Sequence, residues 1–424
     1  MHPLNWVIII AYVGYVVVDG LRRARGTDSI EGYFLANRGL PWWAVGLSVM
    51  ATQLSAVTMI GTTGQGATDG LRFVQFYFGL PIAMVILGVT IVPFLHGAKV
   101  YTAYEFLERR FDAKTRSLTS FLFLLSRGMS CGTIIAAPAV IFSAVFGWSL
   151  PWSVGLIGIP TVIYTMFGGV QAVTWADVKQ MVLIVFALAA VIVVLVLKIP
   201  VSPNEALSIA GATGRLQVFD FSFNFSETYT FWSGIIGGTF LMLSYFGTDQ
   251  SQVQRYLTAR SVNEARTSLL MSAYWKIPLQ AMVLLLGVLV FVFYLFTAPP
   301  LLFNPAQEQA VMTADGEAYR ALEARHETAW QARESAARAL ADAPEQDGAQ
   351  RAAFLARDAE VTEVRGEALA LVERVTGASS RDVNYIIPAF VRNELPLGLA
   401  GIFIAGVMAA AMSSIAAELN SLST

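Results

Sequence analysis

Residues 42–66 read WWAVGLSVMATQLSAVTMIGTTGQG, and this stretch decides the fold. It is long and apolar enough to cross about 30 Å of hydrocarbon as a helix, which takes roughly 20 residues. Its middle nevertheless holds four polar residues, Thr52, Gln53, Ser55 and Thr58. Polar groups inside a membrane span are costly and mark functional positions. We therefore predict a membrane helix that is a candidate for unwinding at mid-membrane.

Two interpretations of this stretch stay open. Unwound backbone carbonyls can coordinate a cation, as they do in discontinuous membrane helices. Alternatively, the small residues let neighbouring helices pack closely. The glycine-rich second half, residues 61–66, does not predict a phosphate-binding loop, because no Lys–Ser/Thr pair follows it.

The composition of the whole chain supports a membrane protein. Of its 424 residues, 55% are hydrophobic and 14% are charged, whereas soluble proteins carry roughly 25% charged residues. The net charge of −2 gives no support for a nucleic-acid partner. A single cysteine, Cys131, and three scattered histidines exclude a disulfide and do not suggest a zinc site. The spans offer no constellation of catalytic groups or metal ligands, so we do not expect an enzyme.

We predict nine helical spans, because a segment in lipid must satisfy its backbone internally. They cover about residues 4–20, 41–66, 71–96, 118–146, 150–168, 177–198, 231–249, 267–297 and 397–423. One set of connecting loops carries 13 lysines and arginines, and the opposite set carries four, leaving aside a long insertion. The positive-inside rule then places the N-terminus outside. We expect a multi-pass protein of the bacterial inner membrane, in contact with lipid.

An insertion divides the chain into three parts. Residues 1–302 hold spans one to eight, residues 303–380 form an extramembrane helical insertion on the external side, and residues 381–424 hold a short external segment and span nine. The insertion is rich in alanine, glutamate and arginine, which favour helices, and opposite charges recur at i,i+4 spacing. We predict two helices broken near residues 344–348. Either the insertion is a solvated addition, or it acts as a lid or partner-binding element.

The ninth span contains a second polar feature. It reads GIFIAGVMAAAMSSIAAELNSLST over residues 401–424, with Ser413 and Ser414 adjacent at mid-helix. Hydroxyls and backbone carbonyls are neutral oxygen ligands, which suit an alkali cation better than a divalent ion. Glu418 lies either at the water interface or in an ion pair. Because an apolar helix ends the sequence at Thr424, we expect C-terminal truncation with later spans missing.

Three charged residues lie in or beside other spans. Arg127 in span four needs a partner, which is either a structural carboxylate or a carboxylate-bearing substrate. Asp177 begins span six from the cytoplasmic side, where it serves as a helix N-terminal carboxylate or as part of an ion path. Lys276 in span eight is expected to reach toward the cytoplasmic interface.

Five segments of the chain, in this order, resemble the sodium:solute symporter family. They are YFLANRGLPWWAVGLSVMATQLSAVTMIG (33–61), TAYEFLERRF (102–111), FGGVQAVTWADVKQ (167–180), FGTDQSQVQRYL (246–257) and GVMAAAMSSIAAELNSLST (406–424). The family includes sodium/glucose, sialic-acid, proline, pantothenate and iodide transporters. The resemblance implies an all-α fold of two inverted five-helix repeats preceded by one extra helix. Spans two to six form the first repeat, and two core helices of the second are absent from the sequence.

The resemblance also implies a sodium site between the interrupted helix and span nine. Its ligands are the carbonyls of Ala51, Leu54 and Ala410 and the hydroxyls of Ser413 and Ser414. Some members bind a second sodium through further serines and an aspartate that matches Asp177. Because alanines 416 and 417 replace those serines, we predict one coupled sodium ion.

The substrate contacts of the family map onto six residues here. They are Gln53, Ser55, Thr58, Tyr77, Arg127 and Tyr245, of which Tyr245 matches an aromatic inner gate. The resemblance implies a sodium-coupled symporter that imports a sugar, sugar acid or monocarboxylate by alternating access. The rival hypothesis is a transporter-like sensor domain of a membrane signalling protein. The sequence is compatible with a monomer.

Overall fold

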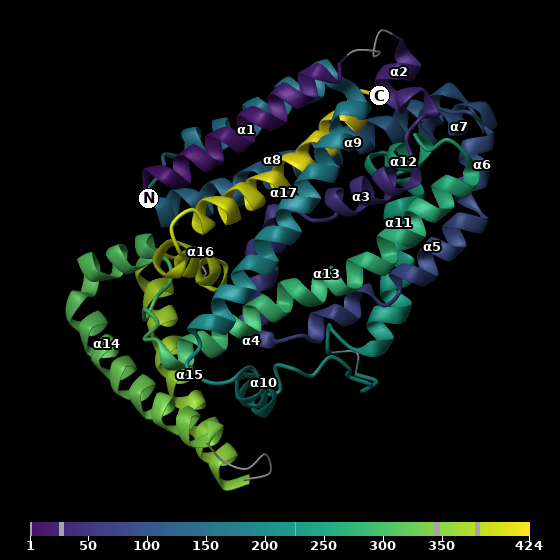
Figure 1. Ribbon diagram of the computed structural model, residues 1–424. Helices are drawn as coiled ribbons and strands as arrows, with labels where there is room; N and C mark the ends of the chain where they lie inside the picture. Colours follow the sequence, from purple (N-terminus) through teal and green to yellow (C-terminus); the bar gives the residue numbers. More distant parts are fainter. Residues whose placement is uncertain (1, 25–28, 225, 343–347, 378–381) are drawn as a thin grey trace.

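The computed structural model describes residues 2–24, 29–224, 226–342, 348–377 and 382–424, and within these ranges the chain is helical without a named strand (Figure 1). One isolated bridge pairs Leu40 with Ala259. The α-helices are α1 (Pro3–Arg22), α2 (Ile30–Leu35), α3 (Trp42–Thr52), α4 (Thr63–Asp69), α5 (Leu80–Val89), α6 (Ile91–Gly97), α7 (Ala103–Arg110), α8 (Ala113–Phe146), α9 (Leu150–Lys198), α10 (Pro203–Ala212), α11 (Gly238–Thr248), α12 (Gln250–Leu257), α13 (Val262–Phe296), α14 (Pro305–Ala341), α15 (Gly348–Thr376), α16 (Val383–Glu394) and α17 (Leu399–Leu422). The 3₁₀ segments η1 (Ala36–Arg38) and η3 (Arg72–Tyr77) and the π segments η2 (Thr58–Thr62) and η4 (Ser233–Gly237) complete the order.

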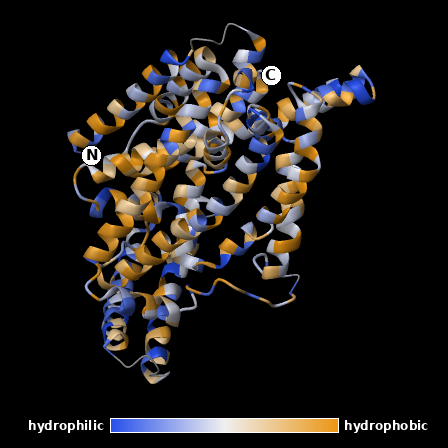
Figure 2. Ribbon diagram, turned by 45° about the vertical axis from the view of Figure 1, so that its right-hand side comes forward, coloured by the Kyte–Doolittle hydropathy of each residue, from blue (hydrophilic) through white to orange (hydrophobic). Residues whose placement is uncertain are grey.

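Six of these helical segments are long and apolar enough to cross a membrane: α1, residues 72–97, α8, α9, α13 and α17. Span two is built from the shorter pieces α3, η2 and α4, and span seven from η4 and α11. Figure 2 shows the bundle largely in the colour of hydrophobic residues. The expected all-helical, multi-pass architecture is therefore present.

The helix of residues 42–66 is interrupted where its polar residues predicted. Helix α3 ends at Thr52, residues 53–55 are not helical, and the chain then re-enters a helix that passes through η2 into α4. The hydroxyl of Ser55 accepts a hydrogen bond from Thr58 N at 3.3 Å. A serine at the start of a helix stabilises it in this way, so Ser55 helps the helix to restart.

The glycines of the same stretch do not unwind it but pack it. A Cβ on Gly64 would lie 2.3 Å from the carbonyl of Val383 in α16, and one on Gly66 would lie 2.4 Å from that of Leu284 in α13. On α13, a Cβ on Gly287 would lie 2.0 Å from the Thr63 carbonyl. The middle of residues 42–66 therefore unwinds, as predicted, and the glycine-rich end packs closely against neighbouring helices.

Helix α9 joins two predicted spans without the expected loop. Spans at 150–168 and 177–198 predicted a connection of several residues, but helix runs up to both sides of Gly169. Gly169 has φ 56° and ψ −161°, and a Cβ there would lie 2.5 Å from the Tyr33 carbonyl. Because glycine adopts positive φ at little cost, one residue replaces the loop.

The insertion forms a two-helix hairpin, α14 and α15, that extends away from the bundle (Figure 1). Of the expected break, residues 344–347 lie outside the described residues, and α15 begins at Gly348. A small apolar cluster that includes Val311, Tyr319 and Leu371 holds the two helices together. Trp330 Nε1 donates to the carbonyl of Tyr294 in α13 at 3.1 Å, which attaches the hairpin to the bundle.

Candidate functional site

The unwound end of α3 meets the serine pair of α17 inside the bundle. Ser414 Oγ lies 3.4 Å from the Thr52 carbonyl and 3.2 Å from the Ala410 carbonyl. Ser413 is fully buried, and Ser414 is 3% exposed. Ala51 in the last turn of α3 and Leu54 in the break are also fully buried. The structure thus brings the end of α3 against Ser414 of α17 through the Thr52 carbonyl.

Asp177 connects this crossing to α9. Its Oδ1 accepts a hydrogen bond from Ser413 Oγ at 2.7 Å, and its Oδ2 accepts one from Ser48 Oγ at 2.6 Å. The guanidinium of Arg255 lies 3.5 Å away. Asp177 and Arg255 are 0% and 2% exposed. Of the two expectations for Asp177, the helix-start carboxylate was wrong, because the residue lies inside α9, well past the irregular backbone at Gly169. Sequence reasoning missed Ser48 and Arg255 as its partners.

The oxygen atoms around the serine pair are ligands that suit a monovalent cation. They are hydroxyls and backbone carbonyls, with one carboxylate a hydrogen bond behind Ser413. Among the described residues no group of three or more His, Cys, Asp or Glu gathers as a metal site. A divalent ion would want several carboxylates. At alanines 416 and 417, both buried, no hydroxyl is present for a second ion.

Four of the six predicted substrate residues belong to the break and the segment beside it. Gln53 Nε2 donates to the Val49 carbonyl at 3.3 Å, and the hydroxyls of Ser55 and Thr58 lie 3.5 Å apart. Tyr77 lies at the end of η3. Lys276 links it to the break, because its Nζ lies 5.2 Å from the centre of the Tyr77 ring and donates to the Gln53 carbonyl.

Lys276 is the principal correction to the sequence prediction. It does not reach an aqueous interface but is fully buried in α13, and its Nζ donates to the Gln53 carbonyl at 3.3 Å. Within the described part of the chain it forms no salt bridge. A buried ammonium without a carboxylate partner is costly. The position of Lys276, ten residues into an apolar span, was the feature of the sequence that could have predicted its burial.

Arg127 and Tyr245 belong to a different cluster, at the junction of α11 and α12. Arg127 forms salt bridges with Asp249 and, at 3.0 Å, with Glu418. Its guanidinium carbon lies 5.7 Å from the Tyr245 ring centre, and the Tyr245 hydroxyl accepts a hydrogen bond from Gln252 Nε2 at 2.7 Å. Of the two alternatives for Arg127, this structure shows structural pairing, and Glu418 is paired rather than exposed.

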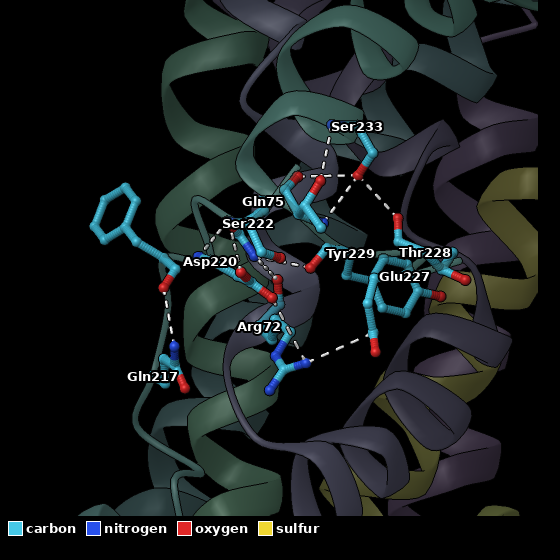
Figure 3. A network of polar contacts seen from close by, with 11 residues as sticks. Arg72, Gln75, Gln217, Asp220, Ser222, Glu227, Thr228, Tyr229 and Ser233 are labelled. Carbon is cyan, nitrogen blue, oxygen red and sulfur yellow. Dashed lines mark hydrogen bonds and ion pairs between the residues drawn. The ribbon is translucent and has the colours of Figure 1, made fainter. Parts of the chain in front are cut away.

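A third polar network joins η3 to residues 217–233 (Figure 3). Gln75, fully buried, donates to the Tyr229 carbonyl at 3.2 Å and accepts from Asp220 N at 2.9 Å. Arg72 lies 3.9 Å from both Asp220 and Glu227. A mostly polar cavity of about 590 Å³ lies beside this network. The network fixes the segment before η4 against η3, which carries Tyr77.

Comparison with known proteins identifies the fold and the family. The sequence model of the sodium:solute symporter family matches residues 33–323. The chain belongs to the sodium:solute symporter family. The resemblance deduced from the five ordered segments is therefore confirmed.

Two curated members of the family illustrate the similarity. The human sodium/iodide cotransporter is 31% identical over 283 residues, which is 67% of this chain and 44% of that protein. The human sodium-coupled monocarboxylate transporter 1 is 33% identical over 244 residues, 58% of this chain and 40% of that protein. The chain thus spans less than half the length of these symporters.

A solved structure supports the fold over the whole chain. It is a sodium-coupled sialic acid symporter in a substrate-bound, outward-open state, with a TM-score of 0.75 and 22% sequence identity. The match covers 99% of this chain and 73% of that one. The match confirms the predicted transporter fold.

Proposed function

We propose that this symporter-family chain carries the ion and solute sites of a sodium-coupled importer of a small polar organic solute. One observation supports this most directly: the break at residues 53–55 lies against Ser413 and Ser414. An interrupted helix and a hydroxyl pair on a neighbouring helix form an enclosed cation site rather than a continuous pore. Sodium is here a transported substrate of the protein.

The proposed sodium ligands are the carbonyls of Ala51, Leu54 and Ala410 and the hydroxyls of Ser413 and Ser414. In the structure the two hydroxyls are satisfied by Asp177 and by backbone carbonyls. Because Ser413 donates its proton to Asp177, the lone pairs of its hydroxyl oxygen would be available to an arriving cation. Asp177 remains close enough to favour positive charge. One ion is proposed.

The proposed solute lies beside Lys276, Gln53 and Tyr77, with Ser55 and Thr58 on the restarting helix. The uncompensated ammonium of Lys276 favours a solute with a carboxylate or another anionic group over a neutral sugar. The names of the iodide and monocarboxylate relatives agree with an anion. We therefore favour a monocarboxylate or sugar acid.

In the proposed transport cycle, sodium binds at the break and orders Gln53, so that solute affinity rises. The coupling is reciprocal, so the solute raises sodium affinity equally. The salt bridges of Arg127 with Asp249 and Glu418 keep the α11–α12 junction closed and must separate for release there. The membrane potential contributes about 2.3 kcal/mol per charge per 100 mV to inward sodium movement.

We further propose the orientation given by the loop charges. The N-terminus and the hairpin would lie outside, and the α11–α12 junction would face the cytoplasm, in a bacterial inner membrane. The protein would act as a monomer in lipid.

The test is thermal unfolding of purified protein in sodium and in potassium. Sodium should stabilise the wild type, because a ligand that binds the folded state raises its stability. The double variant Ser413→Ala, Ser414→Ala should lose this sodium-specific stabilisation. Ser421→Ala is the matched control, since its hydroxyl donates within α17 to the Glu418 carbonyl. Equal stabilisation of the double variant by sodium would refute the site.

The solute is then identified in the same assay. Sugars, sugar acids, monocarboxylates and amino acids are each added in sodium and in potassium. A carboxylate that stabilises the wild type in sodium but not Lys276→Gln is the expected outcome. Stabilisation by a neutral sugar that is independent of Lys276 would contradict the proposed solute class.

A further inference from the structure

A cavity of about 460 Å³ lies where the hairpin α14–α15 meets the bundle. Its walls include three arginines and three aromatic rings, from Arg215, Arg333, Arg365, Phe291, Tyr294 and Phe303. The cavity also touches residues 67–69 at the end of α4, the outer half of the interrupted helix. It is separate from the residues proposed to bind sodium and solute.

Arg333 lines this cavity and carries one donor without a partner. Its side chain is 8% exposed; Nη1 pairs with Asp358 at 3.2 Å, and Nη2 donates to the Tyr294 carbonyl at 3.2 Å. Its Nε is buried and has no hydrogen-bond partner in the described part of the chain. Leaving a buried charged donor unsatisfied is unfavourable, so the geometry calls for an acceptor.

Arg215 and Arg365 also keep donors free. Arg215 Nε donates to the Ala67 carbonyl at 2.9 Å, but its Nη1 lies 3.9 Å from Asp358, too far for a hydrogen bond. Arg365 uses Nη2 for Asp382 at 2.6 Å and Nε for the Leu301 carbonyl at 3.4 Å. No hydrogen bond from Nη1 of either arginine is found among the described residues. The two aspartates thus position the guanidinium groups without saturating them.

The local charge and the wall chemistry define the ligand. Burial, and then the charges of Arg365 and Arg333, lowers the pKa of the nearby His326 to about 4. Asp69, Asp358 and Asp382 also line the cavity and balance the charges of the three arginines, so the unused N–H donors, and not a net positive charge, favour a single carboxylate. Aromatic rings such as Phe291, 3.6 Å from the Arg215 guanidinium carbon, suit an apolar body.

We propose that this cavity is a second ligand site, which binds a small monocarboxylate with an apolar body between the hairpin and the end of α4. The carboxylate accepts hydrogen bonds from the free groups of Arg333, Arg365 and Arg215. Because Arg215 also holds the Ala67 carbonyl, occupancy stabilises the last turn of α4. The site does not rest on the proposed sodium coupling.

Isothermal titration of the purified protein in sodium-free potassium buffer tests this site, with benzoate as the probe and benzamide as its neutral counterpart. Benzoate should bind saturably and benzamide should not. Arg333→Gln and Arg365→Gln should each weaken benzoate binding about tenfold or more, the loss expected for a charged hydrogen bond. Arg320→Gln is the matched control, because Arg320 is exposed on the same helix.

Lys276→Gln separates this site from the proposed solute site. It should leave benzoate binding in potassium unchanged. Any of three results would overturn the proposal. They are a loss of benzoate binding in Lys276→Gln alone, equal binding of benzamide and benzoate, and no saturable binding of benzoate by the wild type. If Arg333→Gln lowers the unfolding temperature, the partly exposed Arg365 still provides the test, because its side chain is 25% exposed.

Discussion

An ion pair inside the bundle and an ion pair on the surface of the hairpin differ in their burial. In the bundle, Asp177 and Arg255 are almost fully buried, and Asp177 has three partners from three other helices. On the hairpin, Arg325 and Glu367 form a bidentate pair with side chains 55% and 42% exposed. Surface ion pairs contribute little to stability, whereas breaking a buried pair is expensive. The burial of an ion pair, more than its presence, therefore decides how much its loss would destabilise the protein.

The largest effect should follow from Asp177→Asn, which leaves the buried Arg255 without a counter-charge. We expect the free energy of unfolding to fall by about 3–5 kcal/mol, the usual result of breaking a buried ion pair. Denaturant unfolding in detergent measures this loss. An unchanged midpoint would mean that Arg255 is hydrated and would end the contrast with the hairpin.

His326 of the hairpin is buried like the charged residues of the bundle, so its protonation should affect the stability of the protein. His326 is 3% exposed, and its pKa is lowered from 6.5 to about 4, first by burial and then by Arg365 and Arg333. The unfolded chain therefore binds a proton that the folded chain rejects, so stability falls as pH decreases from about 6.5 to about 4, by about 1–3 kcal/mol. Thermal unfolding of the wild type and His326→Phe across this range measures the difference. Parallel pH profiles would contradict it.

A smaller effect is expected from Glu418→Gln, because Arg127 retains Asp249. Weakening the cluster by about 1 kcal/mol should raise the population open at the α11–α12 junction about fivefold. Cys131, the single cysteine and one helical turn beyond Arg127, reports this opening through its rate of thiol labelling. A rate equal to that of the wild type would show that the cluster does not control access there.

The smallest effect should come from Arg325→Gln on the hairpin surface. The exposed pair with Glu367 is bidentate, yet we expect little or no loss of unfolding free energy, since solvent screens the pair. The same denaturant assay as for Asp177→Asn measures it. A loss as large as that of Asp177→Asn would remove the distinction between the two regions.

The sequence predicted those parts of the site that depend on local composition. Gln53 and Ser55 stand out as polar residues in a span, and their position predicted the break; the serine pair stood out for the same reason. The helical hairpin followed from composition and charge spacing. These features can be predicted without knowing which residues of other helices pack against them.

The sequence could not reveal which distant residues meet. Lys276 was expected to reach water because long basic side chains commonly do, but its height in the membrane depends on how α13 packs. Likewise, the pairing of Arg127 joins α8 to residues more than a hundred positions away. Gly169 replaced a loop through one positive φ, which hydropathy does not show.

The glycine contacts of α4 have an evolutionary consequence. At Gly66 and Gly287, backbone touches backbone, and each position lacks room for a single methyl group. The commonest mutations of glycine add at least a Cβ, so a lineage that varies either position must also shift α4 against α13. Sequence change at these two positions is therefore more constrained than change at side chains that have room around them.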